Sequence, residues 1–385
     1  MRKPIWKLLC CFLLMIATAL SLAVPIMAET TKKEIAPVMS QAFTDSSDPV
    51  SAVFNTCSYE TAASLTAEEL QELTVCPGGM PFGVKFYTEG VSIVGFCDVE
   101  TKKGAVNPAS EAGLRPKDVI LKVDGTPLTG AGDLTDRIEA GGGKKMTLLC
   151  RRGKREFEAT LQPVFCPAEN RYKTGIWVRD SGAGIGTVTF ILPDTGAFAG
   201  LGHGICDADT GALVAMKRGT VSDVTISSVV KGAAGAPGEL KGYFCTGKVG
   251  ALLGNSACGV WGVFSEVPEC TAEPMHVGLR NEITEGDAYI LCTLDSNKTE
   301  RYDVKISNIN RDATGAKCYT VTVTDPDLLA VTGGIVQGMS GSPIIQNGKL
   351  VGAVTHVLIN DPTTGYGIFI ENMLSAAQMP MAKAS

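Results

Sequence analysis

The clearest pattern along the chain is a series of short apolar alternations in its C-terminal half. Between about residues 170 and 378, alternating apolar and polar runs are separated by Gly, Pro and Asp turns, with no long amphipathic helix between them. Short strands at intervals of roughly 8–12 residues are typical of a β-barrel or β-sandwich. The pattern therefore predicts an all-β domain over residues 165–385 and disfavours a doubly wound α/β sheet.

A smaller domain of mixed structure is predicted ahead of it, over residues 78–164. Apolar residues alternate from Val84 to Val94, as in strands beside a glycine-rich turn. Helices are expected at 108–114 and 134–140, strands at 119–123, 146–151 and 157–161, and a hairpin-type turn at Asp124-Gly125. This order of elements indicates a small α/β domain.

The N-terminus carries a targeting pattern. A basic flank precedes an apolar run that ends at Met27 and is long enough for a cleaved signal peptide or a single membrane anchor. Residues 1–28 therefore predict export across a membrane. The polar stretch 29–77 follows as a linker or stalk, in which residues 65–73 are expected to form one brief helix capped by Thr66.

Composition narrows the functional classes. The chain is 45% hydrophobic and 19% charged, with 44 glycines, which is typical of a turn-rich folded protein. A formal net charge of -6 without a basic cluster argues against a nucleic-acid partner. The 13 cysteines form an odd, scattered set without a C-x-x-C pair, which favours neither a metal site nor a complete disulfide framework. The glycine run 182–186 lacks dinucleotide-binding spacing, so a turn and strand start is expected there and no cofactor is implied.

The strongest chemical signal is the run Gly338-Met339-Ser340-Gly341-Ser342, which lies between two apolar segments. A serine in a tight glycine-flanked turn can project its Oγ, while successive backbone N–H groups point to one spot and stabilise an oxyanion. Ser340 is the predicted nucleophile. Ser342 is expected to face elsewhere and to support the loop.

A histidine in a small-residue loop strengthens this interpretation. Only three histidines occur in the chain, and His203 is flanked by Gly202 and Gly204, which leaves the imidazole room to meet a serine and a substrate. His203 is the predicted base. His276 lies in an expected loop, and His356, close to the serine in sequence, remains the rival.

Residues 78–164 resemble a bacterial PDZ domain. The resemblance is carried by the segment 79–84 and by the run from Ala109 to Ile120. In that family the loop amides hold a peptide C-terminal carboxylate while the peptide adds a strand to the sheet edge. The resemblance implies that Phe82, Gly83 and Val84 form the peptide-binding loop; the alternative is a domain that only docks against its neighbour.

From about residue 76 to 377 the chain closely resembles the stage IV sporulation protein B peptidase family. The surroundings of His203, the segment around Asp325 and the run after Gly334 carry this resemblance. It implies a mainly β fold, a trypsin-like double β-barrel peptidase domain preceded by the small PDZ-like domain and an N-terminal signal or anchor helix. It also implies a triad of His203, Asp325 and Ser340, with the amides of Gly338 and Ser340 as the oxyanion hole.

The third triad member stays open on the residues alone. Asp325 lies 15 residues before Ser340, closer than in trypsin-like enzymes, and also reads as a turn aspartate. Asp223, at the head of an expected strand, competes with it. Met339 stands where trypsin-like enzymes carry an acidic residue, so activation through a buried ion pair with the terminal amine is not available by that route.

The same resemblance implies a role in sporulation signalling. The expected enzyme is an exported serine endopeptidase, secreted into the forespore intermembrane space or anchored by its N-terminal segment. It would cleave its own region 29–79, and then a membrane-associated regulator, so that an intramembrane protease can release a late sigma factor. The alternatives are a catalytically silent PDZ adaptor that binds peptide tails and a cell-envelope quality-control protease of broad specificity.

Overall fold

The computed structural model describes residues 60–61, 65–295, 298–377 and 380–381. The predicted signal or anchor segment 1–28 and most of the linker lie outside these residues. Within the described part, no helix combines the length and apolar character needed to cross a membrane. The short helix α3 (Ala67–Glu72) is present, and Thr66 caps it through a capping box with Glu69, as the sequence predicts.

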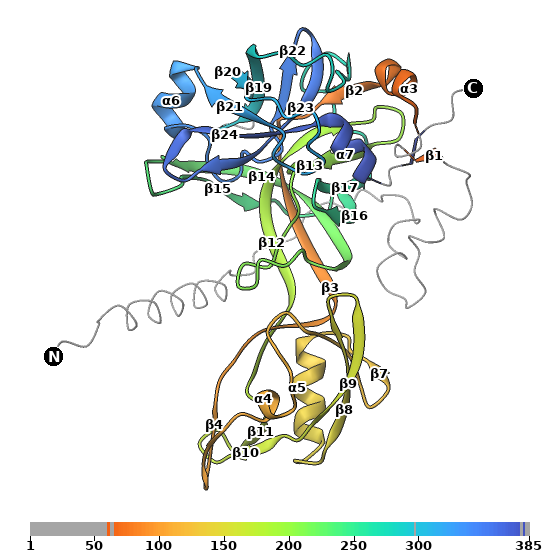
Figure 1. The fold of residues 1–385 in the computed structure, drawn as a ribbon, viewed down its shortest axis with the longest axis vertical. Helices are drawn as coiled ribbons and strands as arrows, with labels where there is room; N and C mark the ends of the chain where they lie inside the picture. Colours follow the sequence, from red (N-terminus) through yellow and green to blue (C-terminus); the bar gives the residue numbers. More distant parts are fainter. Residues whose placement is uncertain (1–59, 62–64, 296–297, 378–379, 382–385) are drawn as a thin grey trace, which may run out of the picture. The chain divides into compact units, whose positions relative to one another are not determined.

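Six strands form a first barrel (Figure 1). They are β3 (Pro81–Phe96), β12 (Ile176–Ile191), β13 (Ala197–Gly200), β14 (Met216–Val230), β16 (Gly250–Ser256) and β17 (Gly259–Phe264). Strand β12 pairs with β13, and the path continues through β17, β16 and β14 to β3. The sheet closes because β3 also pairs with β12. Strands β2 (Thr74–Pro77) and β18 (Met275–His276) extend it beyond β12, and β15 (Glu239–Phe244) pairs with β14.

A second closed barrel follows along the chain. Its strands are β19 (Gly286–Thr293), β20 (Thr299–Ser307), β21 (Tyr319–Val323), β22 (Pro343–Gln346), β23 (Lys349–Leu358) and β24 (Asp361–Phe369). Helix α6 (Pro326–Thr332) follows β21, and α7 (Ile370–Ala376) packs on β23 and β24. Alternating side chains such as Ile290, Val304 and Val321 fill the barrel interior. Strand β1 (Glu60–Thr61) pairs with β25 (Pro380–Met381) near the chain's end.

A small α/β module has its own apolar core, built from residues such as Val91, Ile120, Leu134 and Leu148. Its helices are α4 (Pro108–Glu111) and α5 (Ala131–Ala140). Its further strands are β4 (Val99–Thr101), β5 (Gly104–Val106), β6 (Val119–Val123), β7 (Thr126–Pro127), β8 (Met146–Arg152), β9 (Arg155–Leu161), β10 (Val164–Cys166) and β11 (Arg171–Lys173). The expected helices and strands of this region are therefore present.

The module is inserted into the first barrel. Strand β3 pairs with the barrel strand β14 through residues 82–88 and with the module strand β6 through residues 91–92. Strand β12 then brings the chain back to the barrel, paired with β3 along most of its length. The barrel thus begins before the module, and the boundary expected at residue 78 falls among residues that belong to the barrel.

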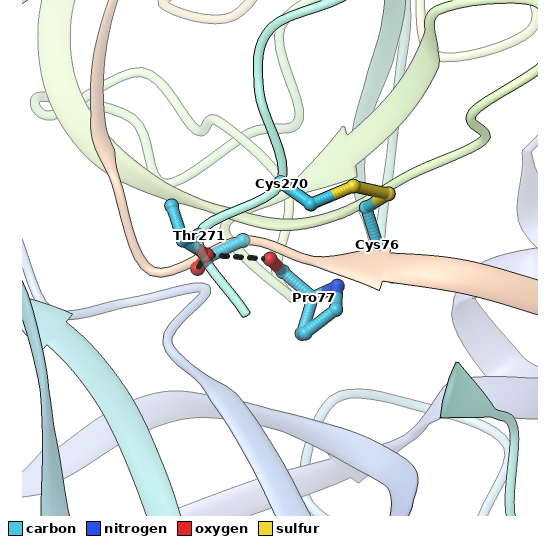
Figure 2. The surroundings of a disulfide bond; sticks show 5 residues. Cys76, Pro77, Cys270 and Thr271 are labelled. Carbon is cyan, nitrogen blue, oxygen red and sulfur yellow. Dashed lines mark hydrogen bonds between the residues drawn. A yellow bond between two sulfur atoms is a disulfide. The ribbon is translucent and has the colours of Figure 1, made fainter. Parts of the chain in front are cut away.

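One disulfide joins the described cysteines, between Cys76 of β2 and Cys270 of the loop before β18 (Figure 2). Beside it the hydroxyl of Thr271 donates to the carbonyl oxygens of Pro77 and Gly78. The bridge therefore fixes the strand that enters the first barrel to a loop 194 residues further along.

Removing this bridge should destabilise the protein. A cross-link between such distant residues restricts the unfolded chain, so the Cys76→Ser, Cys270→Ser double variant should lose about 2–4 kcal/mol of unfolding free energy. Denaturant titration measures the loss, with Cys206→Ser, an exposed free cysteine, as the matched control. Equal stability of the double variant and the wild type would show that the bridge contributes nothing.

Candidate active site

The Ser340 turn lies between α6 and β22 and has alternating free and bonded amides. The amide of Met339 donates to Val336, that of Gly341 to Val354 and that of Ser342 to Met339. Within the described chain, the amides of Gly338 and Ser340 donate no hydrogen bond. These two groups are the ones the resemblance assigns to the oxyanion hole, and both are available to an incoming oxyanion.

The two serines of the turn have different surroundings. Ser340 is half-buried, and its Oγ donates to the carbonyl oxygen of Thr355 at 2.7 Å. The Ser342 side chain is fully buried beside the Cys292 thiol, and its Oγ has no hydrogen-bond partner among the described residues. Ser342 thus faces the interior, whereas Ser340 remains accessible.

His203 follows β13 in a turn whose backbone lies in the left-handed region at Leu201 (φ 66°) and Gly202 (φ 65°). Its Nδ1 lies 3.0 Å from the carbonyl oxygen of Gly204. A carbonyl oxygen only accepts, so Nδ1 carries the proton and Nε2 keeps its lone pair. Burial lowers the pKa of His203, and the bond to Gly204 opposes this shift only partly. The imidazole is therefore held neutral, as a base must be.

Thr187 of β12 ties the histidine loop to the serine turn, a role that the sequence analysis missed. Its carbonyl accepts from the amide of Leu201 at 3.2 Å, and its own amide donates to the Ser340 carbonyl at 3.0 Å. Its hydroxyl donates to the carbonyl of Gly338 at 2.8 Å. Thr187 is 2% exposed, so solvent does not compete for these bonds. In sequence it is one polar residue in a strand, and nothing local distinguishes it.

The structure also brings His356 to His203. The two ring centroids are 4.8 Å apart and the rings are tilted by 42°. His356 follows Thr355 on β23, and its Nδ1 is buried without a hydrogen-bond partner in the described chain. Burial lowers the pKa of His356 to about 4, and the neighbouring His203 and Lys317 side chains add to the shift because they disfavour a positive charge on His356. The third histidine, His276, is exposed on β18.

Asp325, expected as the third triad member, has other partners. It is the N-cap of α6: its carboxylate accepts from the amides of Asp327 and Leu328, both at 3.0 Å. The same carboxylate accepts from the amide of Asp303 at 3.2 Å. None of its hydrogen bonds reaches His203, so the structure does not bring the two together. Asp223, the competitor, is exposed on β14 and is not among the groups that shift the pKa of His203.

The peptide-binding loop expected at Phe82, Gly83 and Val84 is not a loop in the structure. These residues lie in β3, paired with β12 on one edge and β14 on the other. The side chains of Phe82 and Val84 are each 2% exposed, in the core of the first barrel. Strand addition needs unpaired backbone groups, so this assignment is corrected.

Comparison with known proteins identifies the family. The model of the SpoIVB peptidase S55 family matches residues 170–374, more than half of the chain. The chain belongs to this family. A PDZ-domain model matches residues 107–152 of this SpoIVB-type peptidase, within the inserted module. Family membership makes the protein a serine endopeptidase, with a PDZ domain and a mainly β fold.

Partial similarity to solved structures was also found. No curated protein matches the chain. The active form of the Rv3671c protease from M. tuberculosis is 15% identical, with 53% of this chain and 78% of that chain covered and a TM-score of 0.31. The HtrA-type protease AlgW with a decapeptide is 13% identical, with 51% and 52% covered and a TM-score of 0.31. The PDZ domain of an SdrC-like protein from Listeria monocytogenes is 19% identical, with 23% and 87% covered and a TM-score of 0.20.

The described residues contain no group of three or more His, Cys, Asp or Glu side chains arranged to hold a metal ion.

Proposed function

We propose that His203 and Ser340 carry the peptidase reaction as base and nucleophile. The observation that carries the proposal is the Thr187 link, which holds the histidine loop and the serine turn together while the amides of Gly338 and Ser340 stay free. A nucleophile, a neutral base and two free amide donors are the groups that acyl transfer requires.

The reaction follows from these positions. The Ser340 hydroxyl turns from Thr355 towards Nε2 of His203, which takes its proton as Oγ attacks the peptide carbonyl. The amides of Gly338 and Ser340 bind the resulting oxyanion. His203 then gives its proton to the departing amine, and water hydrolyses the acyl-enzyme by the same route in reverse. Catalytic hydrogen bonds often tighten only when substrate is bound, which is consistent with the resting bond to Thr355.

The biological role we propose is sporulation signalling. The enzyme would be exported, would trim its own N-terminal region and would cleave a membrane-associated regulator that controls an intramembrane protease and a late sigma factor. Family membership supports this role. The basic and apolar residues 1–28 support export, as does the disulfide Cys76–Cys270, because such bridges persist in oxidising compartments.

Self-processing tests this role directly. The full chain, exported by a bacterial host, should lose residues from its N-terminal region ahead of Thr74, where strand β2 begins, and mass spectrometry should locate the new N-terminus. The His203→Ala variant should show no cut beyond the end of the signal segment near residue 28, because its serine lacks a base, while His276→Ala should be cut like the wild type. Trimming between residue 28 and Thr74 that continues in His203→Ala would refute self-cleavage, and degradation of unfolded proteins at comparable rates would favour a quality-control protease.

A further inference from the structure

A histidine base needs a partner for its second nitrogen, and the carboxylates considered at this site do not provide one. In serine peptidases a buried carboxylate usually accepts this N–H, fixes the tautomer and stabilises the imidazolium. Here Asp325 caps α6 and Asp223 is exposed on another strand. No carboxylate contributes to the pKa shift of either His203 or His356. In the structure the N–H of His203 donates to the backbone carbonyl of Gly204, so a side-chain acceptor that stabilises the protonated ring has to come from another group.

His356 is placed to be that group. Its ring lies against the His203 ring, with 4.8 Å between centroids. The residue before it, Thr355, accepts the hydroxyl hydrogen of Ser340, so one stretch of β23 contacts both reacting side chains. Strand pairing between β23 and β24 is irregular between Val354 and Val357, the stretch that contains His356. Such bulges re-aim side chains and often occur next to active sites.

His356 has a ring nitrogen that is free to accept a hydrogen bond. Its Nδ1 is buried and has no partner in the described chain, although leaving a buried polar atom unpaired is costly. The titratable groups that act on His356 are His203 and Lys317, and both lower its pKa by disfavouring a positive charge on its ring. His356 therefore stays neutral at neutral pH and keeps a lone pair for the N–H of His203.

We propose that His356 is the positioning residue for His203, accepting the N–H that faces away from Ser340 and so occupying the role usually held by a carboxylate. The inference rests on the proposed function of His203 and Ser340. In the resting structure that N–H donates to Gly204 instead. A small rotation of the His203 ring exchanges Gly204 for His356 and turns Nε2 to the serine. This role needs no proton transfer from His203 to His356. His356 stabilises the positive charge of the His203 imidazolium by accepting its hydrogen bond.

Three replacements of His356 separate positioning from packing. His356→Phe keeps a ring but loses the acceptor, and should lower kcat about 100-fold or more with little change in KM. His356→Asp restores an acceptor and should recover much of that loss. A carboxylate beside His203 favours its protonated form and raises its pKa, so the acid limb of kcat/KM should move to higher pH in His356→Asp. His276→Asn, on exposed β18, is the control.

The outcomes are distinct. Wild-type activity and an unchanged pH profile in His356→Phe would overturn the proposal, as would equal loss in Phe and Asp variants that fold normally by circular dichroism. Where the Phe variant fails to fold, the pH shift of His356→Asp decides alone. Labelling of Ser340 by a fluorophosphonate in the wild type reports separately on the proposed function: if labelling occurs and His356→Phe stays fully active, only the role of His356 fails.

Discussion

Replacing Ser340 with alanine should abolish peptidase activity while leaving the fold intact. The hydroxyl is the proposed nucleophile and makes one hydrogen bond, to the carbonyl of Thr355. Losing a serine nucleophile typically costs a factor of 10³ or more in kcat, whereas losing one hydrogen bond costs about 1 kcal/mol in stability. Fluorophosphonate labelling and hydrolysis of a fluorogenic peptide measure the first effect, and thermal unfolding measures the second.

Ser342→Ala is the matched control because it removes the same atom two residues away. The Ser342 hydroxyl is buried without a hydrogen-bond partner, so its removal should leave labelling unchanged and stability unchanged or slightly higher. If labelling persisted in Ser340→Ala and disappeared in Ser342→Ala, the nucleophile would be Ser342 and the turn would have to open to expose it.

Gly341→Ala should damage stability and activity together. Gly341 has φ 99°, a conformation that side chains rarely adopt, and an added Cβ would overlap the carbonyl oxygen of Thr187 and the amide of Leu201. Both are backbone atoms of the link between the two catalytic loops, so they cannot move aside cheaply. We expect a loss of at least about 4 kcal/mol in unfolding free energy, and loss of labelling at Ser340.

Gly348→Ala separates backbone strain from this steric conflict. Gly348 has a similar positive φ of 76°, but no atom lies within 4 Å of an added Cβ. This variant should lose only about 1 kcal/mol and should keep its activity. Equal destabilisation of the two variants, measured by denaturant titration, would mean that the close approach of Gly341 to Thr187 has no energetic importance.

The alternation of apolar residues predicted the strands well, because that pattern is local. Strand 119–123 has the expected bounds, and the glycine run 182–186, read as a turn and strand start, lies within a strand. Local alternation could not predict that the module is inserted into the barrel. The insertion depends on β3 pairing with β12 and β14, whose residues follow about 90 to 150 positions later, and no local pattern reports such pairing.

At the active site, too, local sequence signals were informative and long-range contacts were not predictable. Glycines around His203 and Ser340 pointed to exposed side chains, and both residues lie on turns joined by Thr187. Asp325 was taken from the family resemblance, whereas the local signal, an aspartate directly before a proline, is that of a helix N-cap. His356 was recognised as a rival base, but its contact with the His203 ring depends on strand β23 and could not be foreseen.

The insertion has a consequence for how far this enzyme can be shortened. The segment from Thr74 to Thr88 supplies β2 and the barrel half of β3, which pair with β12 and β14. A truncation that starts after the module would therefore open the first barrel and discard Cys76, the partner of Cys270. Maturation by proteolysis can proceed up to this segment, but a cut beyond it would remove a wall of the catalytic unit. An N-terminal truncation therefore cannot remove the PDZ domain without also removing strands of the peptidase barrel.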